Sequence, residues 1–345
     1  MLTLTGLRLE RAQASKQFHN GRFRNTTGIR PGMQGNTGAI MRDFFFGGKK
    51  RVPRAPLPIE NPVPTWATPV DSGLRVTWLG HSTLLLEIDG VRILTDPVFG
   101  DYASPVSFAG RKRFHPVPAK LAQLPPLDAV LLSHDHYDHL CRPTIRELAR
   151  MRVPFVTSLG VGERLERFGV GATLITELDW WESHLLPAGV KLTATPAQHF
   201  SGRGLTDRNA TLWSSWVIET SKRKIFFSAD TGLTDELATV GERLGPFDLT
   251  MLEIGASNPA WADIHLGPAN AVRAFEMLGG GTLFPIHWGT FDLALHRWDE
   301  PAESLVTLAE QRGIRVITPQ LGNPFEPTQI QGATPWWRGV NKLKA

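Results

Sequence analysis

Short runs of apolar and β-branched residues, separated by turn residues, begin near residue 74. The first three runs follow one another closely: Leu74–Leu79, Thr83–Ile88 and Val91–Thr95. Asp89 and Gly90 form a two-residue turn of the kind that joins hairpin strands, so these runs predict a β-meander. A long, proline-containing loop is expected from Asp96 to Leu127.

Beyond this loop, apolar runs alternate with segments of helical character. The expected strands are Ala129–Leu132, Pro154–Ser158, Thr173–Leu178, Val190–Pro196, Leu212–Thr220, Lys224–Ser228, Leu249–Ile254, Thr282–Ile286 and Arg315–Thr318. The expected helices are Pro143–Met151, Gly162–Phe168, Asp235–Leu244, Pro268–Leu278 and Glu303–Gln311. Hairpins followed by strands interleaved with helices favour an α/β (α+β) domain, in which helices cover the outer faces of two packed sheets.

The beginning of the chain has a different pattern. Residues 1–52 are rich in Gly, Asn, Thr and Arg and show no sustained period, and five prolines follow between residues 53 and 64. Closely spaced prolines predict a stiff, extended connector. We therefore predict a basic, Pro-rich N-terminal extension over residues 1–65 and one folded domain over residues 66–345. A total of 345 residues suits such a domain.

Charge is concentrated in the extension. Residues 1–54 hold eleven Lys and Arg but only two Asp and Glu, whereas the whole chain has a net charge of +4. The segment Phe44–Phe46 lies just before Lys49, Lys50 and Arg51. Aromatic rings beside basic residues could contact an anionic membrane surface. The alternative is an extension wrapped on the domain with its charges in water.

Other classes of protein are disfavoured by the composition. Because the remaining chain is net acidic, a long groove that tracks nucleic acid is not expected. The single cysteine, Cys141, excludes an intrachain disulfide. No apolar stretch reaches 18 residues, and Arg8, Glu10 and Arg11 interrupt the run that a secretory signal needs. We predict a cytoplasmic protein whose residues 1–54 are the candidates for peripheral membrane contact.

The densest cluster of polar residues is Ser133-His134-Asp135-His136-Tyr137-Asp138-His139, directly after an apolar strand. Alternate side chains at a strand end point the same way, so His134 and His136 can bind one metal ion. As the chain turns toward a helix, Asp138 and His139 are expected to face a second position. Histidine and carboxylate ligands suit Zn, Fe or Mn.

Six residues cannot complete two coordination shells, so later strand ends must supply ligands. His199, Asp230 and His287 each follow an apolar strand, which is where α/β folds place active sites. A lone histidine in such a place is usually structural, and an Asp before Thr-Gly is often a turn residue. Near the first cluster, all three become candidate ligands, and the two oxygens of Asp230 could bridge two metals.

The His-Asp-His-Tyr-Asp-His run resembles the His-x-His-x-Asp-His signature of the metallo-β-lactamase superfamily. Further motifs resemble its N-acyl-phosphatidylethanolamine-hydrolysing phospholipase D branch: Trp78-Leu79-Gly80-His81-Ser82, Thr95-Asp96-Pro97, Ala103-Ser104-Pro105, Leu178-Asp179-Trp180-Trp181-Glu182, Ala229-Asp230-Thr231-Gly232 and Ile286-His287-Trp288-Gly289-Thr290-Phe291. The resemblance implies an αβ/βα four-layer sandwich, two zinc ions (with Fe or Mn as other candidates) and a homodimer.

The same resemblance implies roles for individual residues. His134, His136 and His199 would bind the first metal, and Asp230 would be shared. The second metal would be bound by these residues: Asp138, His139 and His287. The resemblance also places His265 near the substrate phosphate and Tyr137 close to the metals.

Two positions depart from the family pattern. Cys141 stands where a carboxylate is common, and Ile264 replaces a polar neighbour of the loop histidine. Neither is a ligand position in the motif. Cys141 could change the hydrogen bonds behind the ligands, and Ile264 could change the contact with a headgroup.

Two metals about 3.5–4 Å apart can bind a bridging hydroxide and lower its pKa toward neutrality. The most specific expectation is therefore a phospholipase D-type phosphodiesterase acting on N-acyl-phosphatidylethanolamine or a related lipid. Asp138 would orient the nucleophile, and His265 would donate a proton to the leaving alcohol. The alternative is a soluble metal-dependent hydrolase of another ester, such as a sugar-phosphate lactonase. A non-catalytic binding protein is disfavoured because all seven ligand positions are intact.

Overall fold

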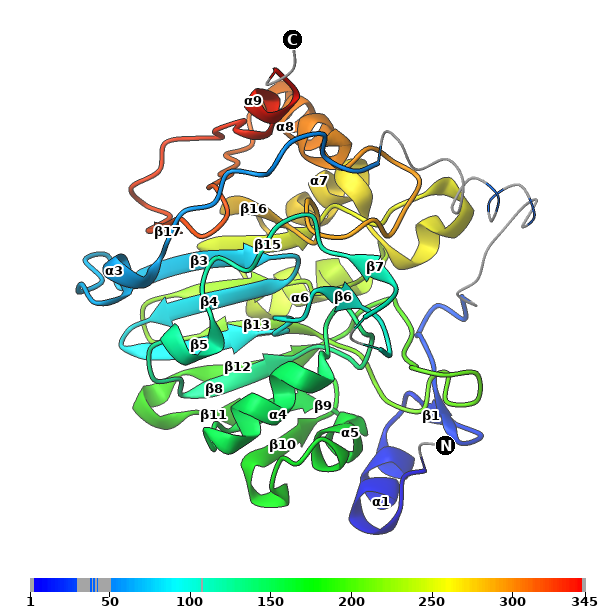
Figure 1. Cartoon of the computed structure of the whole chain (residues 1–345). Coiled ribbons are helices and arrows are strands. Elements are labelled where there is room, and N and C mark those ends of the chain that lie inside the picture. The colour runs from blue at the N-terminus through cyan, green and yellow to red at the C-terminus, as the bar shows by residue number, and fades with distance from the viewer. Residues whose placement is uncertain are drawn as a thin grey trace.

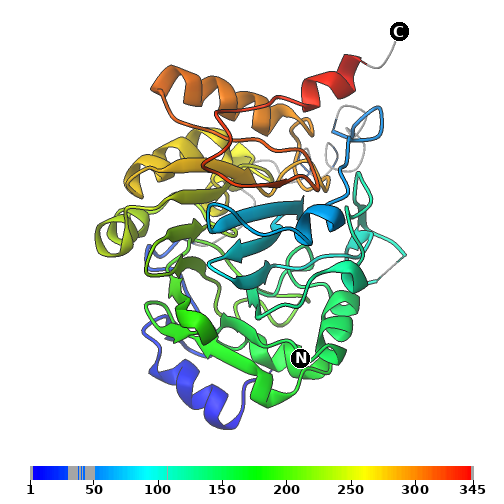
Figure 2. The ribbon, with the colours of Figure 1, turned by 90° about the vertical axis from the view of Figure 1, so that its left-hand side faces the viewer.

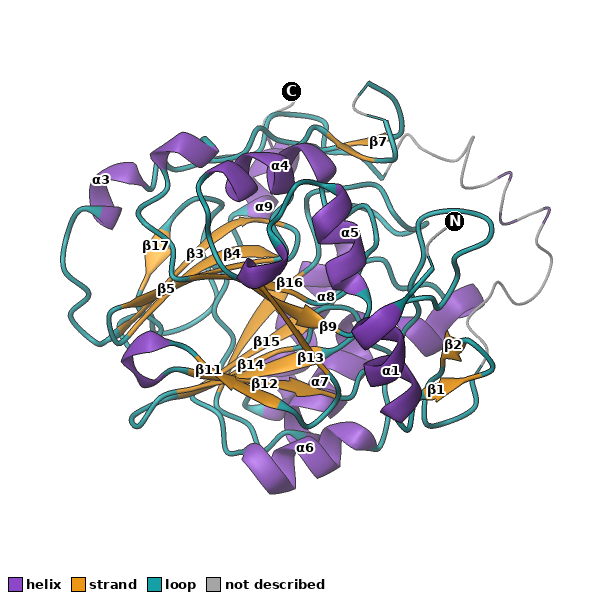
Figure 3. Cartoon of the chain, turned by 90° about the horizontal axis from the view of Figure 1, so that it is seen from below, coloured by secondary structure: helices purple, strands orange, loops and turns teal. Residues whose placement is uncertain are grey.

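The computed structural model describes residues 3–29, 51–106 and 108–342, together with residues 38, 40 and 42. Two mixed β-sheets pack face to face, and helices lie on their outer sides (Figure 1; Figure 3). This arrangement confirms the predicted four-layer sandwich.

The first sheet has seven strands in the order β10-β9-β8-β5-β4-β3-β17. Their bounds are β3 Leu74–Gly80, β4 Thr83–Ile88, β5 Val91–Thr95, β8 Ala129–Leu132, β9 Phe155–Ser158, β10 Ile175–Leu178 and β17 Pro324–Phe325. Strands β3, β4 and β5 form the predicted antiparallel meander, whereas β5, β8, β9 and β10 run parallel. The carboxyl ends of β3, β5 and β8 therefore meet at one edge of this sheet.

The second sheet has six strands in the order β11-β12-β13-β14-β15-β16. Their bounds are β11 Ser183–Leu185, β12 Lys191–Thr195, β13 Ser215–Glu219, β14 Lys224–Phe227, β15 Leu249–Glu253 and β16 Thr282–Ile286. Strands β11 to β14 are antiparallel, and β14 to β16 are parallel. Consequently β12, β14, β15 and β16 all end on the same side.

The outer layers consist of amphipathic helices. Their bounds are α4 Arg142–Arg150, α5 Val161–Arg167, α6 Glu236–Leu244, α7 Gly267–Met277 and α8 Glu300–Arg312. Helix α4 buries Ile145 and Leu148 against Leu85 and Val130 of the first sheet. Helices α6 and α7 cover the second sheet, and α8 packs beside α7. The largest core lies between the two sheets, where strand residues with period-two spacing meet.

The remaining elements are short. Their bounds are α1 Gly6–Ala14, β1 Phe18–His19, β2 Arg22–Phe23, α3 Val63–Trp66, β6 Tyr102–Ala103, β7 Arg111–Lys112, η2 Leu121–Gln123, η3 Ala172–Leu174, η4 Pro187–Gly189, η5 Pro259–Ile264 and α9 Trp337–Lys342. Within the described residues, no helix is long and apolar enough to cross a membrane.

Residues 1–52 show no sustained period in the sequence, yet this segment contains helix α1. This helix buries only Ala12, so its own sequence pattern is weak. It is held instead by Arg8, which lies 3.0 Å from a carboxylate oxygen of Glu166 and 2.5 Å from one of Glu177. Figure 2 shows this blue helix beside the green β10 and α5 region. The predicted aromatic and lysine cluster, Phe44–Phe46 with Lys49 and Lys50, lies outside the described residues.

The expected strand Arg315–Thr318 is also wrong, because the segment makes only one β-bridge, between Leu283 and Val316. The Leu283 N–H donates to the Arg315 carbonyl at 2.9 Å, and the Leu283 carbonyl accepts from the Ile317 N–H at 3.0 Å. Continuing this parallel ladder would require N–H donors from Pro285 and Pro319, and proline has none.

Candidate metal centre

The predicted ligands lie where the carboxyl ends of strands from both sheets meet. His134, His136 and His139 follow β8, and His199 follows β12. Asp230 follows β14, and His287 comes directly after β16. The backbone N–H of His287 donates to the His81 carbonyl at 3.0 Å, which ties the two sheets together at this edge.

One group of donors consists of His134, His136, His199 and Asp230. The His136 Nδ1 atom lies 2.9 Å from His134 Nε2 and 3.2 Å from His199 Nε2. The Oδ2 atom of Asp230 lies 3.9 Å from His134 Nε2 and 3.6 Å from His199 Nε2. Three ring nitrogens and one carboxylate oxygen thus converge, which is a four-donor set typical of a metal site.

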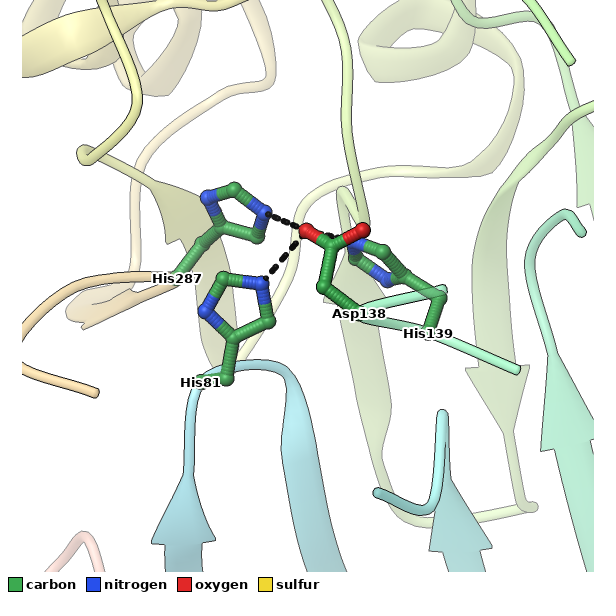
Figure 4. Close-up of side chains that lie close together, drawn as sticks. All are labelled: His81, Asp138, His139 and His287. Carbon is green, nitrogen blue, oxygen red and sulfur yellow. Dashed lines mark hydrogen bonds and ion pairs between the residues drawn. The ribbon is translucent and has the colours of Figure 1, made fainter. Parts of the chain in front are cut away.

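A second group consists of His81, Asp138, His139 and His287 (Figure 4). Asp138 Oδ2 lies 2.9 Å from His81 Nε2 and 3.5 Å from the Nε2 atoms of both His139 and His287. Asp230 adds its other oxygen, Oδ1, which lies 3.1 Å from His139 Nε2 and 3.0 Å from His287 Nε2. Asp230 therefore presents one oxygen to each group, as a bridging ligand would.

The hydrogen bonds indicate that a cation fits between these residues. Among the described residues, buried His139 Nε2, His287 Nε2 and Asp230 Oδ1 have no hydrogen-bond partner of acceptable geometry, although Asp230 Oδ1 lies 3.1 Å from His139 Nε2 and 3.0 Å from His287 Nε2. Buried polar atoms are rarely left unsatisfied. Nitrogen and carboxylate donors that converge in this way suit Zn, Fe or Mn.

The two groups differ in charge. Burial keeps the pKa of His134 well below its usual value, so its ring is neutral. Burial also disfavours the charged rings of His139 and His287, but the Asp230 carboxylate outweighs it, with help from Asp138. The pKa of His139 is raised well above its usual value, and that of His287 is raised to about 10. The same contacts hold the pKa of both carboxyl groups well below the usual range despite their burial.

Residues behind the ligands fix the orientation of their rings. His139 Nδ1 lies 2.8 Å from the carboxylate of Asp96, and Asp96 also accepts from the Ser133 hydroxyl at 2.6 Å. His199 Nδ1 lies 2.9 Å from the backbone carbonyl of Ile264. Residue 264 thus orients the His199 ring through its backbone carbonyl, and a residue with any side chain could provide this contact. Such outer contacts set the tautomer and basicity of ligand histidines.

Asp135 is in the motif but faces away from the donors. Its carboxylate accepts from Arg164 Nε at 3.1 Å and from the Gly202 N–H at 2.7 Å. It therefore anchors α5 and the loop after β12. Of the two aspartates in the motif, only Asp138 joins the donor groups.

His265 lies beside both donor groups. Its ring centroid is 5.2 Å from that of His199 and 5.4 Å from that of His287. His265 Nδ1 lies 2.8 Å from an oxygen of Glu253, the last residue of β15. Burial lowers the pKa of His265, but Glu253 outweighs it and the pKa is raised overall. The protonated ring can therefore act as a hydrogen-bond or proton donor.

Several residues of the site have unusual backbone conformations. His81, Ala229 and His287 have φ values of 55°, 48° and 63°. For residues other than glycine this region costs about 1–3 kcal/mol, and such strain gathers at functional sites. Gly255 is required nearby, because a Cβ atom there would lie 2.0 Å from the His287 carbonyl oxygen.

Tyr137 is placed at the rim of the site. Its hydroxyl donates to the Arg203 carbonyl at 2.7 Å, and the Arg203 guanidinium lies 3.9 Å from the centroid of its ring.

The sequence pattern did not indicate His81 or Glu253 as site residues. Both were detectable, since His81 directly follows β3 and Glu253 ends an otherwise apolar strand. Neither lies within a cluster of polar residues, which is why both were missed.

Comparison with known proteins identifies the family of this chain. The family model described as the beta-lactamase superfamily domain matches residues 91–288, which is more than half of the chain. An uncharacterized protein of Mycobacterium tuberculosis is 47% identical over 290 residues, covering 83% of this chain and 77% of the relative. N-acyl-phosphatidylethanolamine-hydrolyzing phospholipase D 1 of Caenorhabditis elegans is 36% identical over 312 residues, covering 86% and 87%.

A solved structure supports the fold. The isothiocyanate hydrolase from Delia radicum gut bacteria superposes with a TM-score of 0.58 at 22% identity, covering 73% of this chain and 98% of that one. The sandwich and its two donor groups define a protein of the metal-dependent hydrolase class. The chain belongs to the metallo-β-lactamase superfamily and resembles its N-acyl-phosphatidylethanolamine-hydrolysing phospholipase D branch.

Proposed function

We propose that the protein is a zinc-dependent phosphodiesterase of phospholipase D type that acts on N-acyl-phosphatidylethanolamine or a related lipid. The observation that carries this proposal is the shared carboxylate of Asp230 between two donor groups, with protonated His265 beside them. The similarity to the Caenorhabditis elegans phospholipase supports the choice of substrate.

In this proposal, the first donor group would hold one zinc ion and the second would hold another, with Asp230 shared. Their ligands are His134, His136 and His199 for the first and Asp138, His139 and His287 for the second. Ions held there would activate a water molecule as the nucleophile and neutralise charge on the phosphate oxygens. Asp138, which belongs to the second group, would also orient the nucleophile.

His265 supplies the proton for the leaving alcohol. Glu253 accepts from Nδ1 and so leaves Nε2 as the donor toward the substrate. Tyr137 at the rim contacts the substrate as it enters. We further propose that the chain acts as a cytoplasmic homodimer with peripheral membrane contact through residues 1–54, and that nucleic acid is not a partner.

The first experiment is hydrolysis of N-acyl-phosphatidylethanolamine by the zinc-loaded protein, followed by mass spectrometry. We expect N-acylethanolamine and phosphatidic acid as products. Asp138→Asn should abolish them. If two metals bind per chain but no product forms, the lipid substrate is wrong, and lactones and small phosphodiesters are the next substrates to assay.

A second comparison tests the proton donor. His265→Gln should keep both metals by elemental analysis while turnover falls by about 10²–10⁴-fold, the usual contribution of general acid catalysis. His184→Gln on β11, which is remote from the donor groups, is the matched control and should behave as wild type. Equal turnover in the two variants would remove His265 from the mechanism.

A further inference from the structure

A groove of about 650 Å³ lies beside the metal centre, and no predicted ligand lines it. One wall is α4, and the other is the segment from Gly100 to Val106 together with Phe108. Tyr137 also lines it and immediately precedes Asp138 in the chain. The groove therefore includes the chain neighbour of one residue of the second donor group. We name it the α4 groove.

The α4 wall carries a row of arginines. Arg142, Arg146 and Arg150 are spaced four residues apart, so they share one face of the helix, and all three are exposed. Among the described residues they make no ion pair, whereas Arg312 and Arg338 each lie 2.7 Å from a glutamate oxygen. Like charges at this spacing repel and destabilise a helix. Within the described residues, the row thus has no carboxylate partner.

The opposite wall includes Asp101 and Ser104 and carries two exposed apolar side chains near its end. Phe108 is 78% exposed and Val106 is 40% exposed. Between the walls lies Phe168, whose ring centroid is 5.8 Å from the Arg142 guanidinium and 5.7 Å from that of Arg203. Arginine side chains that can bind phosphate, placed beside exposed apolar side chains, are typical of a surface that contacts lipid headgroups and the upper part of the acyl chains.

We propose that the α4 groove docks the enzyme on an anionic phospholipid surface. The arginine row would bind lipid phosphates, and Phe108 with Val106 would enter the acyl boundary. A single soluble anion fits less well, because eight residue steps along α4 span about 12 Å, which is wider than one phosphate. This proposal rests on the proposed function, since docking here would bring lipid to Tyr137 and the metal centre.

Vesicle sedimentation of the zinc-loaded full chain tests the proposal. Vesicles of phosphatidylcholine with phosphatidylglycerol should bind the protein, and phosphatidylcholine alone should bind it less. Each arginine near an anionic surface contributes about a fivefold change in partitioning, so Arg146→Gln with Arg150→Gln should weaken binding by about 25-fold. The matched control, Arg312→Gln with Arg338→Gln, removes the same charge elsewhere and should change binding by less than twofold.

Hydrolysis separates docking from the proposed reaction. On vesicles, the Arg146 and Arg150 double variant should lose activity, whereas a short-chain, monomeric N-acyl-phosphatidylethanolamine should be cleaved at the wild-type rate. Unchanged vesicle binding by this variant, with wild-type hydrolysis intact, would overturn docking alone. Arginine-dependent binding by a wild-type protein that cleaves no lipid would overturn the reaction and keep the docking site. If inorganic phosphate binds with full dependence on the arginines but vesicles do not, the groove is a small-anion site and docking is wrong.

Discussion

The two donor groups of the metal centre contain the same residue types, but the pKa values of their histidines are shifted in different directions. His134 and His199 in the first group are neutral, because burial dominates and a single carboxylate oxygen is nearby. In the second group, Asp138 and Asp230 both face the rings, and the pKa of His287 is raised to about 10. For His139 and His287 the two facing carboxylates outweigh burial, whereas His81, which lies 2.9 Å from Asp138, has its pKa lowered to about 3 by burial. Because His139 and His287 must lose their protons before they can bind a metal, we expect metal binding by the second group to weaken more steeply as the pH falls.

The largest effect is expected from Asp230→Asn, which removes the carboxylate that both groups share. Removing one partner from a buried ion cluster costs about 3–5 kcal/mol, or roughly 10²–10⁴-fold in affinity. Elemental analysis should show loss of both metals, with turnover near background. If two metals remain bound, Asp230 is not a bridging ligand. Asp138 alone would then account for the different histidine pKa values in the two groups.

A paired comparison separates the two groups. Asp138→Asn should lower metal content from two to one by emptying the second group, and His136→Gln should do the same for the first. X-ray absorption would distinguish the products, because three nitrogen ligands remain in the first case and more oxygen ligands in the second. Identical spectra would mean that the groups are not independent.

A smaller effect is expected at the residue behind His139. Asp96→Asn keeps the shape of the side chain but weakens the hydrogen bond that orients this ligand. Loss of such an outer contact typically lowers metal affinity by about 10–100-fold. Competition with a chelator should show weaker binding of one metal only. Equal weakening of both metals would show that Asp96 acts on the fold and not on one group.

The smallest effect is expected from the N-terminal segment. The Asn25 side chain donates to the His199 carbonyl at 2.9 Å and accepts from its N–H at 3.0 Å. Asn25→Ala should therefore loosen the first group, with a few-fold faster loss of one metal, since a hydrogen bond contributes about 1 kcal/mol. Asn270→Ala on α7 is the control. No change in metal release would show that the extension does not position the ligand.

Much of the fold was predictable because each strand has a strong local pattern. The runs that became β4 and β5 are apolar or β-branched and flank a two-residue turn, so tertiary contacts are not needed to locate them. Helix α1 was missed because ion pairs of Arg8 with distant glutamates stabilise it. The predicted strand at Arg315–Thr318 does not form because Pro285 and Pro319, which are far apart in sequence, both lack the N–H groups that would extend the single bridge into a ladder.

The sequence by itself determined the superfamily, the dense ligand motif after β8 and the candidates at later strand ends. The order of chemical groups along the chain is enough for these. Only the tertiary structure decided that Asp135 faces Arg164, that His81 and Glu253 join the site and that Asp230 lies between both groups. Only the tertiary structure places the arginine row of α4 and Phe108 on the walls of one groove. These properties depend on distances between residues far apart in sequence, and the packing of the two sheets sets those distances.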